Sequence, residues 1–487
     1  MKMNMQKQNR RNFLKTAGVA AAAVSLSARA WAQVAGANGD IRVAVVGFKG
    51  RGADHIKGFS GIKGVRITAL CDCDEEVLRG GVERMKKQGV EVKGYRDIRK
   101  LLESSEVDVV SIATPNHWHS LGAIWAIQAG KDVYVEKPVS HNVWEGRQLV
   151  NFARKYNKIV QCGTQSRSSL AGIKAAVEWV REGNLGKILV ARGICYKPRG
   201  SIGKVDGPQP IPPGVDYDLW CGPALKLPLM RKRLHYDWHW VWNTGNGDLG
   251  NQGIHEMDVA RWFLGEMELA PYVLTAGGRL GYVDDGETPN TLISFQGYAR
   301  APLIFEVRGL PSKAGDKNMD KYKGATIGIV IECENGHVTV PSYSSATAYD
   351  KDGKEIKKWS GAEDHYANFI KAVRSRKKEE LNAEILEGHL SSALCHTSNI
   401  SYRLGAQKPP EEIKEALKND RGMSEAFERM AEHLAANNVD IKAKGSMVTL
   451  GVPLKMDPKT ERFLNNTAAN EMLTRPYRAP FVVPEKV

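Results

Sequence analysis

Glycines and basic side chains are concentrated in a turn that follows an apolar segment near the start of the chain. The turn has the sequence GFKGRG at residues 47–52. In a dinucleotide-binding GxGxxG turn, the first glycine permits the turn, the second lets the backbone approach the pyrophosphate, and the third lets helix and strand pack closely. Gly47 and Gly52 match the outer positions, whereas Lys49 replaces the middle glycine and Gly50 lies beside it. We therefore expect the close approach one residue later; an ordinary glycine-rich turn is the alternative.

A carboxylate follows the second apolar segment at a spacing that suits ribose recognition. Asp72 lies 20 residues beyond Gly52. At that position a carboxylate accepts hydrogen bonds from the adenosine ribose hydroxyls and repels a 2′-phosphate. The sequence thus predicts NAD rather than NADP, with a surface turn residue as the alternative for Asp72.

Apolar segments alternate with amphipathic stretches over the first third of the chain. Strands that alternate with helices of this length predict a parallel sheet with right-handed crossovers, which here is an α/β Rossmann domain over residues 40–165. The predicted strands are 41–46, 65–70, 107–113, 133–135 and 159–161, and the predicted helices include 75–87 and 121–129.

The pattern changes beyond residue 165. A helix at 173–182 is followed by a Pro/Gly-rich stretch over 198–228. We expect an α+β second domain over 166–450, with a largely antiparallel open sheet and helices on one face, and a tail over 451–487 that packs on the body. The predicted strands are 273–276, 290–295, 304–308 and 326–333, and the later helices are 366–376 and 384–396.

Tryptophans cluster just after the Pro/Gly-rich stretch. Four of the eleven fall within 23 residues, from Trp220 to Trp242. Aromatic faces pack against the C–H faces of sugars, so a pyranoside-like substrate is predicted; the alternative is that these rings fill a core under the loop. The candidate substrate contacts are Trp238, Trp240 and Trp242, with Arg167 and Tyr196 as further candidates for the pocket wall.

Three further motifs complete a recognisable set. TPNHWH at 114–119 follows the third long apolar segment, EKP at 136–138 follows the next, and GNQGIHEMD lies at 250–258. Together with GFKGRG, these motifs resemble the Gfo/Idh/MocA family of oxidoreductases, named for glucose-fructose oxidoreductase and inositol dehydrogenase. The resemblance covers nearly the whole mature chain, and the EKP tripeptide is its most specific element.

The resemblance implies that Lys137 lies beside the nicotinamide and contacts the reacting hydroxyl. An ammonium there would stabilise a developing alkoxide. Without the resemblance, Lys137 would be interpreted as a solvated turn residue. The expected cofactor contacts are Gly47, Phe48, Lys49, Gly50, Arg51, Gly52, Asp72, Thr114, Pro115, Asn116, His119, Glu136, Lys137 and Gln165.

Family members commonly carry an acid four residues before the catalytic histidine. Here that spacing falls on Asn251 and His255, which share a helix face if the helix has begun by then. His255 could take the hydroxyl proton, because an unperturbed imidazole has a pKa of about 6.5. Asn251 can hydrogen-bond a sugar hydroxyl but cannot ionise, so the chain departs from the family's proton relay. A capped helix histidine without chemistry is the alternative for His255.

The first 32 residues are interpreted as an export signal. Arg10-Arg11 precede an apolar run of about ten residues, too short to span a membrane, and cleavage is expected after Ala32. The segment resembles a twin-arginine signal; a plain secretory or lipoprotein-type leader is the alternative. Its six basic residues and no acid reduce the formal charge of +14 to +8 for the mature chain. Without a dense basic run, no nucleic-acid partner is expected.

The function predicted from these features is an exported, periplasmic, NAD-dependent oxidoreductase with a tightly bound cofactor. Hydride transfer would occur at a hydroxyl of a sugar, cyclitol or glycoside. An NAD-dependent glycosidase or lyase acting through a transient keto-sugar is the alternative, and a non-catalytic sugar-binding relative is a third. We expect no metal site and no transmembrane span after the leader, and homo-oligomers formed through the second domain.

Overall fold

Six parallel strands form the sheet of the first domain in the computed structural model, which describes residues 39–486. The strand order is β3-β2-β1-β4-β5-β6, so the order reverses between β1 and β4. Open α/β sheets bind ligands at the carboxyl ends of the strands beside such a reversal. The strands are β1 (Ile41–Val46), β2 (Val65–Cys71), β3 (Lys93–Tyr95), β4 (Val109–Ile112), β5 (Asp132–Val135) and β6 (Val160–Cys162).

Helices cover both faces of this sheet, which confirms the predicted Rossmann domain. Helix α4 has the predicted bounds because the Asp74 side chain accepts hydrogen bonds from the amides of Glu76 and Val77 and thereby caps its start. The sheet contacts α5, α6 and α7 on one face and α3 and α4 on the other. The helices are α3 (Arg51–Ser60), α4 (Glu75–Lys87), α5 (Ile98–Leu102), α6 (His119–Gln128) and α7 (Val143–Lys155).

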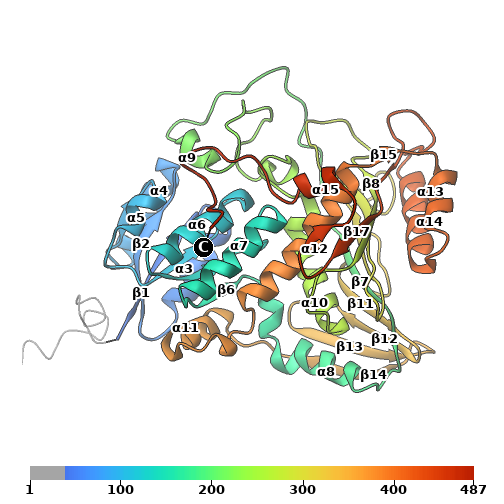
Figure 1. The fold of residues 1–487 in the computed structure, drawn as a ribbon, viewed down its shortest axis with the longest axis horizontal. Helices are drawn as coiled ribbons and strands as arrows, with labels where there is room; N and C mark the ends of the chain where they lie inside the picture. The colour runs from blue at the N-terminus through green and yellow to red at the C-terminus, as the bar shows by residue number, and fades with distance from the viewer. Residues whose placement is uncertain (1–38, 487) are drawn as a thin grey trace, which may run out of the picture.

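Helix α11 (His365–Ser375) belongs by packing to the first domain although it follows the strands of the second (Figure 1). Phe369 is fully buried, and its ring lies 6.2 Å from that of Phe59 on α3 and 5.8 Å from that of Tyr134 on β5. The first domain is therefore completed by a segment outside residues 40–165.

The second domain contains a 12-stranded sheet. Its order along the main path is β14-β13-β12-β11-β7-β10-β9-β8-β16-β15, and all neighbouring pairs are antiparallel except the central pair of β7 and β10. The largely antiparallel sheet was predicted, with the parallel centre as the exception. The main strands are β7 (Ile188–Tyr196), β8 (Tyr272–Gly278), β9 (Thr291–Gln296), β10 (Leu303–Arg308), β11 (Ile327–Cys333), β12 (Gly336–Val340), β13 (Ser345–Asp350) and β14 (Glu355–Ser360); β15 (Ala406–Gln407) and β16 (Thr449–Leu450) are short.

Helices lie on both faces of this second sheet, so the expectation of helices on one face is wrong. Helices α8 (Ala175–Arg181), α10 (Ile254–Leu264) and α12 (Ile385–Arg403) pack on the inner face. Helices α13 (Pro410–Leu417) and α14 (Arg421–Ala436) cover β8, β9 and β10 from the other side. The physical reason is that β8, β9 and β10 carry apolar side chains on both faces, and α13 and α14 shield the outer ones from water.

The last part of the chain returns from the second domain to the first. Strands β17 (Leu454–Asp457) and β18 (Arg462–Phe463) and helix α15 (Thr467–Glu471) pack on the second domain. The residues that follow cross to the first domain, and the chain ends beside α6 and α7 (Figure 1).

The predicted signal and its cleavage site after Ala32 lie outside the described residues. Within residues 39–486, none of the helices combines the length and the apolar character that a bilayer-spanning segment requires.

Replacing Phe369 by alanine should lower the free energy of unfolding by about 3 to 5 kcal/mol, because it removes a buried aromatic ring shared by α11, α3 and β5. Chemical denaturation followed by circular dichroism measures this loss. Lys371→Ala, on the solvent side of the same helix, is the matched control and should change stability by less than about 0.5 kcal/mol. Equal effects of the two substitutions would contradict the assignment of α11 to the first-domain core.

Candidate functional site

The glycine turn after β1 is shaped by two close contacts. Gly47 has a φ of +74°, and a Cβ there would lie 2.9 Å from the Thr114 backbone. A Cβ on Gly52 would lie 2.1 Å from the Gly47 carbonyl oxygen. At Gly50, by contrast, a Cβ would meet nothing within 4 Å. The outer glycines are therefore required by packing, and the open backbone faces the cleft at Gly50.

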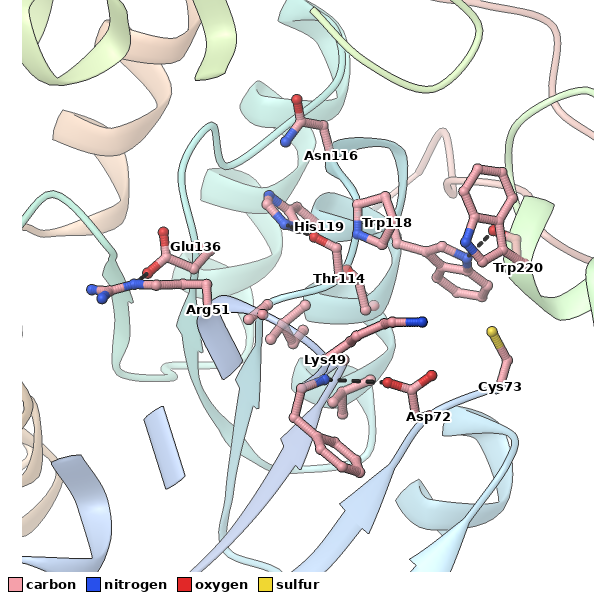
Figure 2. Close-up of a pocket in the computed structure, with 18 of the residues that line it drawn as sticks. Lys49, Arg51, Asp72, Cys73, Thr114, Asn116, Trp118, His119, Glu136 and Trp220 are labelled. Carbon is pink, nitrogen blue, oxygen red and sulfur yellow. Dashed lines mark hydrogen bonds and ion pairs between the residues drawn. The ribbon is translucent and has the colours of Figure 1, made fainter. Parts of the chain in front are cut away.

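This turn opens a cleft of about 550 Å³ between the two domains. One wall is formed by the carboxyl ends of β1, β2, β4 and β5, and the opposite wall by a loop of the second domain. Figure 2 shows Lys49 and Trp118 extending into the same space, with Asp72 and Cys73 at one end and Glu136 at the other. The second-domain side is contributed by Leu219, Trp220, His235, Tyr236, Trp238, His239 and Asn251.

Asp72 lies at the end of β2, beside the glycine turn. Its Oδ2 accepts a hydrogen bond from the Phe48 amide at 3.2 Å, and its Oδ1 accepts one from the Asp74 amide at 3.1 Å. Burial raises the pKa of this carboxyl to about 6, although the two backbone amides act in the opposite direction. The carboxylate is thus held in one orientation at the end of the cleft where the sequence predicts ribose binding.

Glu136 is buried at the end of β5 and is surrounded by donors. Its Oε1 lies 2.9 Å from Nε of Arg51 and 3.0 Å from Nε2 of His55, and Nε2 of Gln165 lies 3.5 Å away (Figure 2 shows the Arg51 contact). Burial alone would raise its pKa, but the His55 hydrogen bond and the charges of Arg51 and Lys137 hold that pKa well below the usual range. Glu136 therefore stays ionised next to Lys137.

Lys137 connects the two domains. Its Nζ donates a hydrogen bond to the backbone carbonyl of Asn251 at 2.5 Å. Burial lowers the pKa of the ammonium, while the carboxyl groups of Glu136 and Glu256 raise it in part. The group is a desolvated lysine that lines the cleft.

Asn251 and His255 do not lie on one regular helix. Asn251 is in a π-helical turn, Leu249–Gly253, and α10 begins only at Ile254. The His255 ring is nearly buried and stands 4.9 Å from the ring of Tyr343, and its Nδ1 has no hydrogen-bond partner among residues 39–486. Burial, and then the charge of Lys137, hold the pKa of His255 well below its usual range. The imidazole is therefore neutral in these surroundings.

A polar cluster beside His255 was not predicted from the sequence. Nζ of Lys197 donates to Oε1 of Gln252 at 3.1 Å, and Nε2 of Gln252 donates to Oε1 of Glu256 at 3.0 Å. Burial raises the pKa of the Glu256 carboxyl to about 8. The position of Glu256 directly after His255 is the only feature of the sequence that could have indicated this cluster. Tyr343 comes from the distant turn between β12 and β13.

The predicted aromatic contacts divide into two groups. Trp238 lines the cleft, as do Trp220 and the neighbouring side chains Tyr236 and His239. Trp240 does not line it, because its ring is buried under the Arg199 guanidinium at 5.0 Å. Trp242 is also elsewhere, with its ring 6.4 Å from Tyr402 and 5.0 Å from the Arg403 guanidinium.

Arg167 and Tyr196 also lie outside the cleft wall. The Arg167 guanidinium is buried in a bidentate pair with Asp258, with Nε to oxygen distances of 3.1 and 3.0 Å. The hydroxyl of Tyr196 donates to Oε2 of Glu306 at 2.7 Å inside the second domain. The polar ends of both side chains are bound to acidic side chains inside the second domain, and neither faces the cleft.

The remaining predicted cofactor contacts meet around the TPNHWH segment. Nε2 of His119 lies 2.7 Å from the Thr114 carbonyl oxygen, and its Nδ1 lies 2.6 Å from the Pro138 carbonyl oxygen (Figure 2 shows the Thr114 contact). Oγ1 of Thr114 and Oδ1 of Asn116 are buried with no hydrogen-bond partner in the part of the chain that the structure describes. Pro115 lines the cleft beside them.

These features fit a dinucleotide. The open backbone at Gly50 leads into α3, whose start has no side-chain cap, so the helix end is available to an anion. Two unpartnered polar atoms and a fixed carboxylate lie further along the same cleft. No group of three potential metal ligands was found among residues 39–486.

The fold and the cleft define a class of protein: a Rossmann domain of the NAD-binding type joined to an α/β domain that closes its cleft. Residues 41–164 match the Gfo/Idh/MocA oxidoreductase family description with an NAD-binding Rossmann fold, and residues 187–284 match the C-terminal alpha/beta domain of that family. Both domains thus match domains of the Gfo/Idh/MocA oxidoreductase family, in agreement with the resemblance of the sequence motifs. Residues 7–27 match the signal sequence of the twin-arginine translocation pathway, which confirms the predicted signal and indicates export.

Curated relatives resemble part of the chain. A glycosyl hydrolase family 109 protein of Shewanella pealeana is 31% identical over 211 residues, covering 38% of this chain and 45% of the relative. One of Solibacter usitatus is 34% identical over 160 residues, covering 30% of this chain and 36% of the relative. The similarity thus spans less than half the length of these relatives.

Solved structures share the fold more completely. The WlbA dehydrogenase of Bordetella pertussis, solved with NADH and UDP-GlcNAcA, matches with a TM-score of 0.54 at 18% identity, covering 74% of this chain and 96% of that chain. An oxidoreductase domain protein of Kribbella flavida also has a TM-score of 0.54 at 18% identity, with the same coverage of both chains. At these identities the similarity concerns the fold alone.

Replacing Glu256 by glutamine should remove one component of the pH dependence of stability. The pKa of about 8 in the folded protein lies above the ordinary value of 4.5, so the folded state keeps a proton that the unfolded state has lost. The free energy of unfolding of the wild type should therefore fall as the pH rises from about 4.5 to about 8, by at most about 1.4 kcal/mol per pH unit. Denaturant titrations at several pH values measure this slope, which should be shallower in Glu256→Gln.

The matched control is Glu428→Gln, on the exposed side of α14, which should keep the wild-type slope. Parallel profiles for Glu256→Gln and the wild type would show that the Glu256 carboxyl is not held protonated.

Proposed function

We propose that this protein is an exported NAD-dependent oxidoreductase that retains its cofactor and transfers hydride at a hydroxyl of a sugar, cyclitol or glycoside. The observation that carries the proposal is the desolvated Lys137, which lines the dinucleotide-type cleft and contacts Asn251, four residues before His255. The twin-arginine signal supports action in the periplasm.

The cofactor would be held by groups that line or adjoin the cleft. The turn from Gly47 to Gly52 would bind the pyrophosphate and Asp72 the adenosine ribose, which favours NAD over NADP. When bound, NAD supplies the hydride acceptor and, in reverse, the donor. The further proposed contacts are Phe48, Lys49, Gly50, Arg51, Thr114, Pro115, Asn116, His119, Glu136, Lys137 and Gln165.

The proton chemistry belongs to the side chains near Lys137. His255, whose Nδ1 has no hydrogen-bond partner among residues 39–486, would take the proton of the reacting hydroxyl, and Lys137 would stabilise the negative charge that develops on oxygen. Asn251 keeps Lys137 in place through its backbone carbonyl and leaves its side-chain amide free to bind a substrate hydroxyl. Residue 251 is an asparagine and cannot ionise. The nearest protonated carboxyl in the sequence is that of Glu256, which directly follows His255.

A carbohydrate substrate is supported by the wall opposite the first domain. Trp238 and Tyr236 offer aromatic faces, and His239 adds a polar group, close to Asn251. The names of the relatives and of the WlbA complex concern glycosides and a nucleotide sugar, and this points in the same direction.

Export supports retention of the cofactor. Twin-arginine export moves folded proteins, and a nucleotide that dissociated outside the cytoplasm could not readily be replaced. Hydride taken from one substrate must then be returned to a second substrate, or to the same molecule after a chemical step.

A second candidate function is favoured by the relatives named glycosyl hydrolase family 109. In this route the sugar hydroxyl is oxidised to a ketone, and the neighbouring C–H becomes acidic enough to lose a proton. Elimination then breaks the glycosidic bond, water adds to the product, and hydride returns to the ketone, so the net reaction is hydrolysis. The same side chains would serve either route. A non-catalytic sugar-binding relative is the third candidate.

Replacing Lys137 by alanine should reduce kcat by about 10² to 10⁴-fold, because the charge on the reacting oxygen loses its stabilising ammonium. Bound nucleotide should remain, since most of the proposed contacts are untouched. Steady-state kinetics and the nucleotide content of the purified variant measure the two effects. Lys87→Ala, on the surface of α4, should match the wild type in both. Full activity in Lys137→Ala would contradict the proposed chemistry and favour a binding protein.

The net reaction can be decided with nitrophenyl glycosides and no added NAD. Hydrolysis predicts steady release of nitrophenol, because each turnover returns the hydride. Dehydrogenase action predicts no release, and accumulation of a keto-sugar when an artificial electron acceptor is present. We expect keto-sugar formation. Sustained nitrophenol release would contradict this expectation and show that the protein acts as a glycosidase.

A further inference from the structure

The wall of the cleft opposite the first domain is a loop that has little regular structure. Between residues 198 and 243 it contains only α9 (Tyr217–Cys221) and a 3₁₀ turn at Asp237–Trp240. Its own hydrophobic cluster is small and is built on Trp220, Cys221, Leu229 and Leu234. Contacts with other parts of the molecule must therefore fix this wall in its position over the cleft.

Residues 474–483, here named the C-terminal strap, supply such contacts. The strap leaves α15 and crosses over the region of α9 to the first domain (Figure 1). Its far end is anchored by Phe481 and Val483, which are buried in the core of the first domain at 1% and 0% exposure. The Phe481 ring lies 5.6 Å from that of Trp118 and 6.2 Å from that of Trp125.

Two arginines of the strap bind the loop. Nη1 of Arg478 donates to Oδ1 of Asp218 at 2.8 Å, and its Nη2 donates to the carbonyls of Asp218 and Gly222 at 2.9 and 3.0 Å. Nη2 of Arg475 donates to Oδ1 of Asn243 at 2.8 Å. The strap therefore holds the loop near both ends of the segment from Trp220 to Trp242.

Trp118 joins the strap, the loop and the cleft. Its Nε1 donates to the carbonyls of Leu219 and Trp220 at 2.9 and 3.1 Å, and its ring lines the cleft (Figure 2). Gly222, with a φ of +48°, packs so closely on this ring that a Cβ would lie 2.2 Å from it. The loop, Trp118 and Phe481 thus form one packed unit over the nucleotide end of the cleft.

We propose that the C-terminal strap is a latch that retains the dinucleotide, so that release requires the strap to leave the loop. This inference rests on the proposed function, which requires that the protein retain its dinucleotide, and it assigns that retention to the strap. Contacts that hold a closed wall slow ligand release more than they alter the contacts of the ligand itself. The direct nucleotide contacts remain those of the first domain.

The test is the release rate of nucleotide from Arg478→Ala. Protein loaded with NADH is mixed with excess NAD, and the loss of bound-nucleotide fluorescence gives the rate. Release should become at least about tenfold faster, since three charge-assisted hydrogen bonds to the loop are lost. The control is Arg462→Ala, an exposed arginine of β18, which should release nucleotide at the wild-type rate.

Two further variants keep the inference testable. Arg475→Ala removes the second anchor and should also speed release, so the latch can be examined even if Arg478→Ala folds poorly. In a double-mutant cycle, Asp218→Asn should add little to the release rate of Arg478→Ala, because the two side chains act on the same contact.

The outcomes separate the two claims. Nucleotide bound by all variants and released at one common rate would overturn the latch and leave the proposed function intact. A wild-type protein that binds no nucleotide would overturn the proposed function, and the latch with it.

Discussion

The hydrogen bond from the Lys137 ammonium to the Asn251 carbonyl is the interaction on which the site depends. It joins the end of β5 in the first domain to the π-helical turn before α10 in the second. A buried ammonium is costly unless charged or polar partners compensate for its lost water. Here the Asn251 carbonyl and the ionised Glu136 share that task. This contact therefore fixes the turn before α10 relative to the end of β5, where both residues line the cleft.

This constraint also explains the surroundings of Lys137. Glu136 can stay ionised in a buried position because Arg51 and His55 donate to it, and Arg51 starts the helix that follows the glycine turn. The turn and the lysine are thus linked through one carboxylate. On the other side, the loop wall faces the cleft that Lys137 lines, and the C-terminal strap contacts that loop.

Local sequence patterns predicted the first domain well because its elements follow from local rules. The apolar segment 41–46 and the amphipathic stretch 75–87 predicted β1 and α4 with the bounds that the structure has. The fold class and the family resemblance were confirmed, and the Lys137 ammonium contacts the carbonyl of Asn251, four residues before His255. Helix α11 was predicted as an element, but its packing on the first-domain core was not, and neither were the path of the strap nor the place of Tyr343, since these depend on contacts distant in sequence. Arg167 and Tyr196 show the same limit, because a sequence does not reveal that a polar group is consumed by an internal acid.

The most direct test of the account is a crystal structure of the protein with NAD. The account predicts the pyrophosphate at the turn that opens at Gly47, beside the Gly50 backbone, and the nicotinamide ring in contact with Lys137. A cleft filled only by side chains, or a nucleotide whose nicotinamide lies far from Lys137, would contradict it.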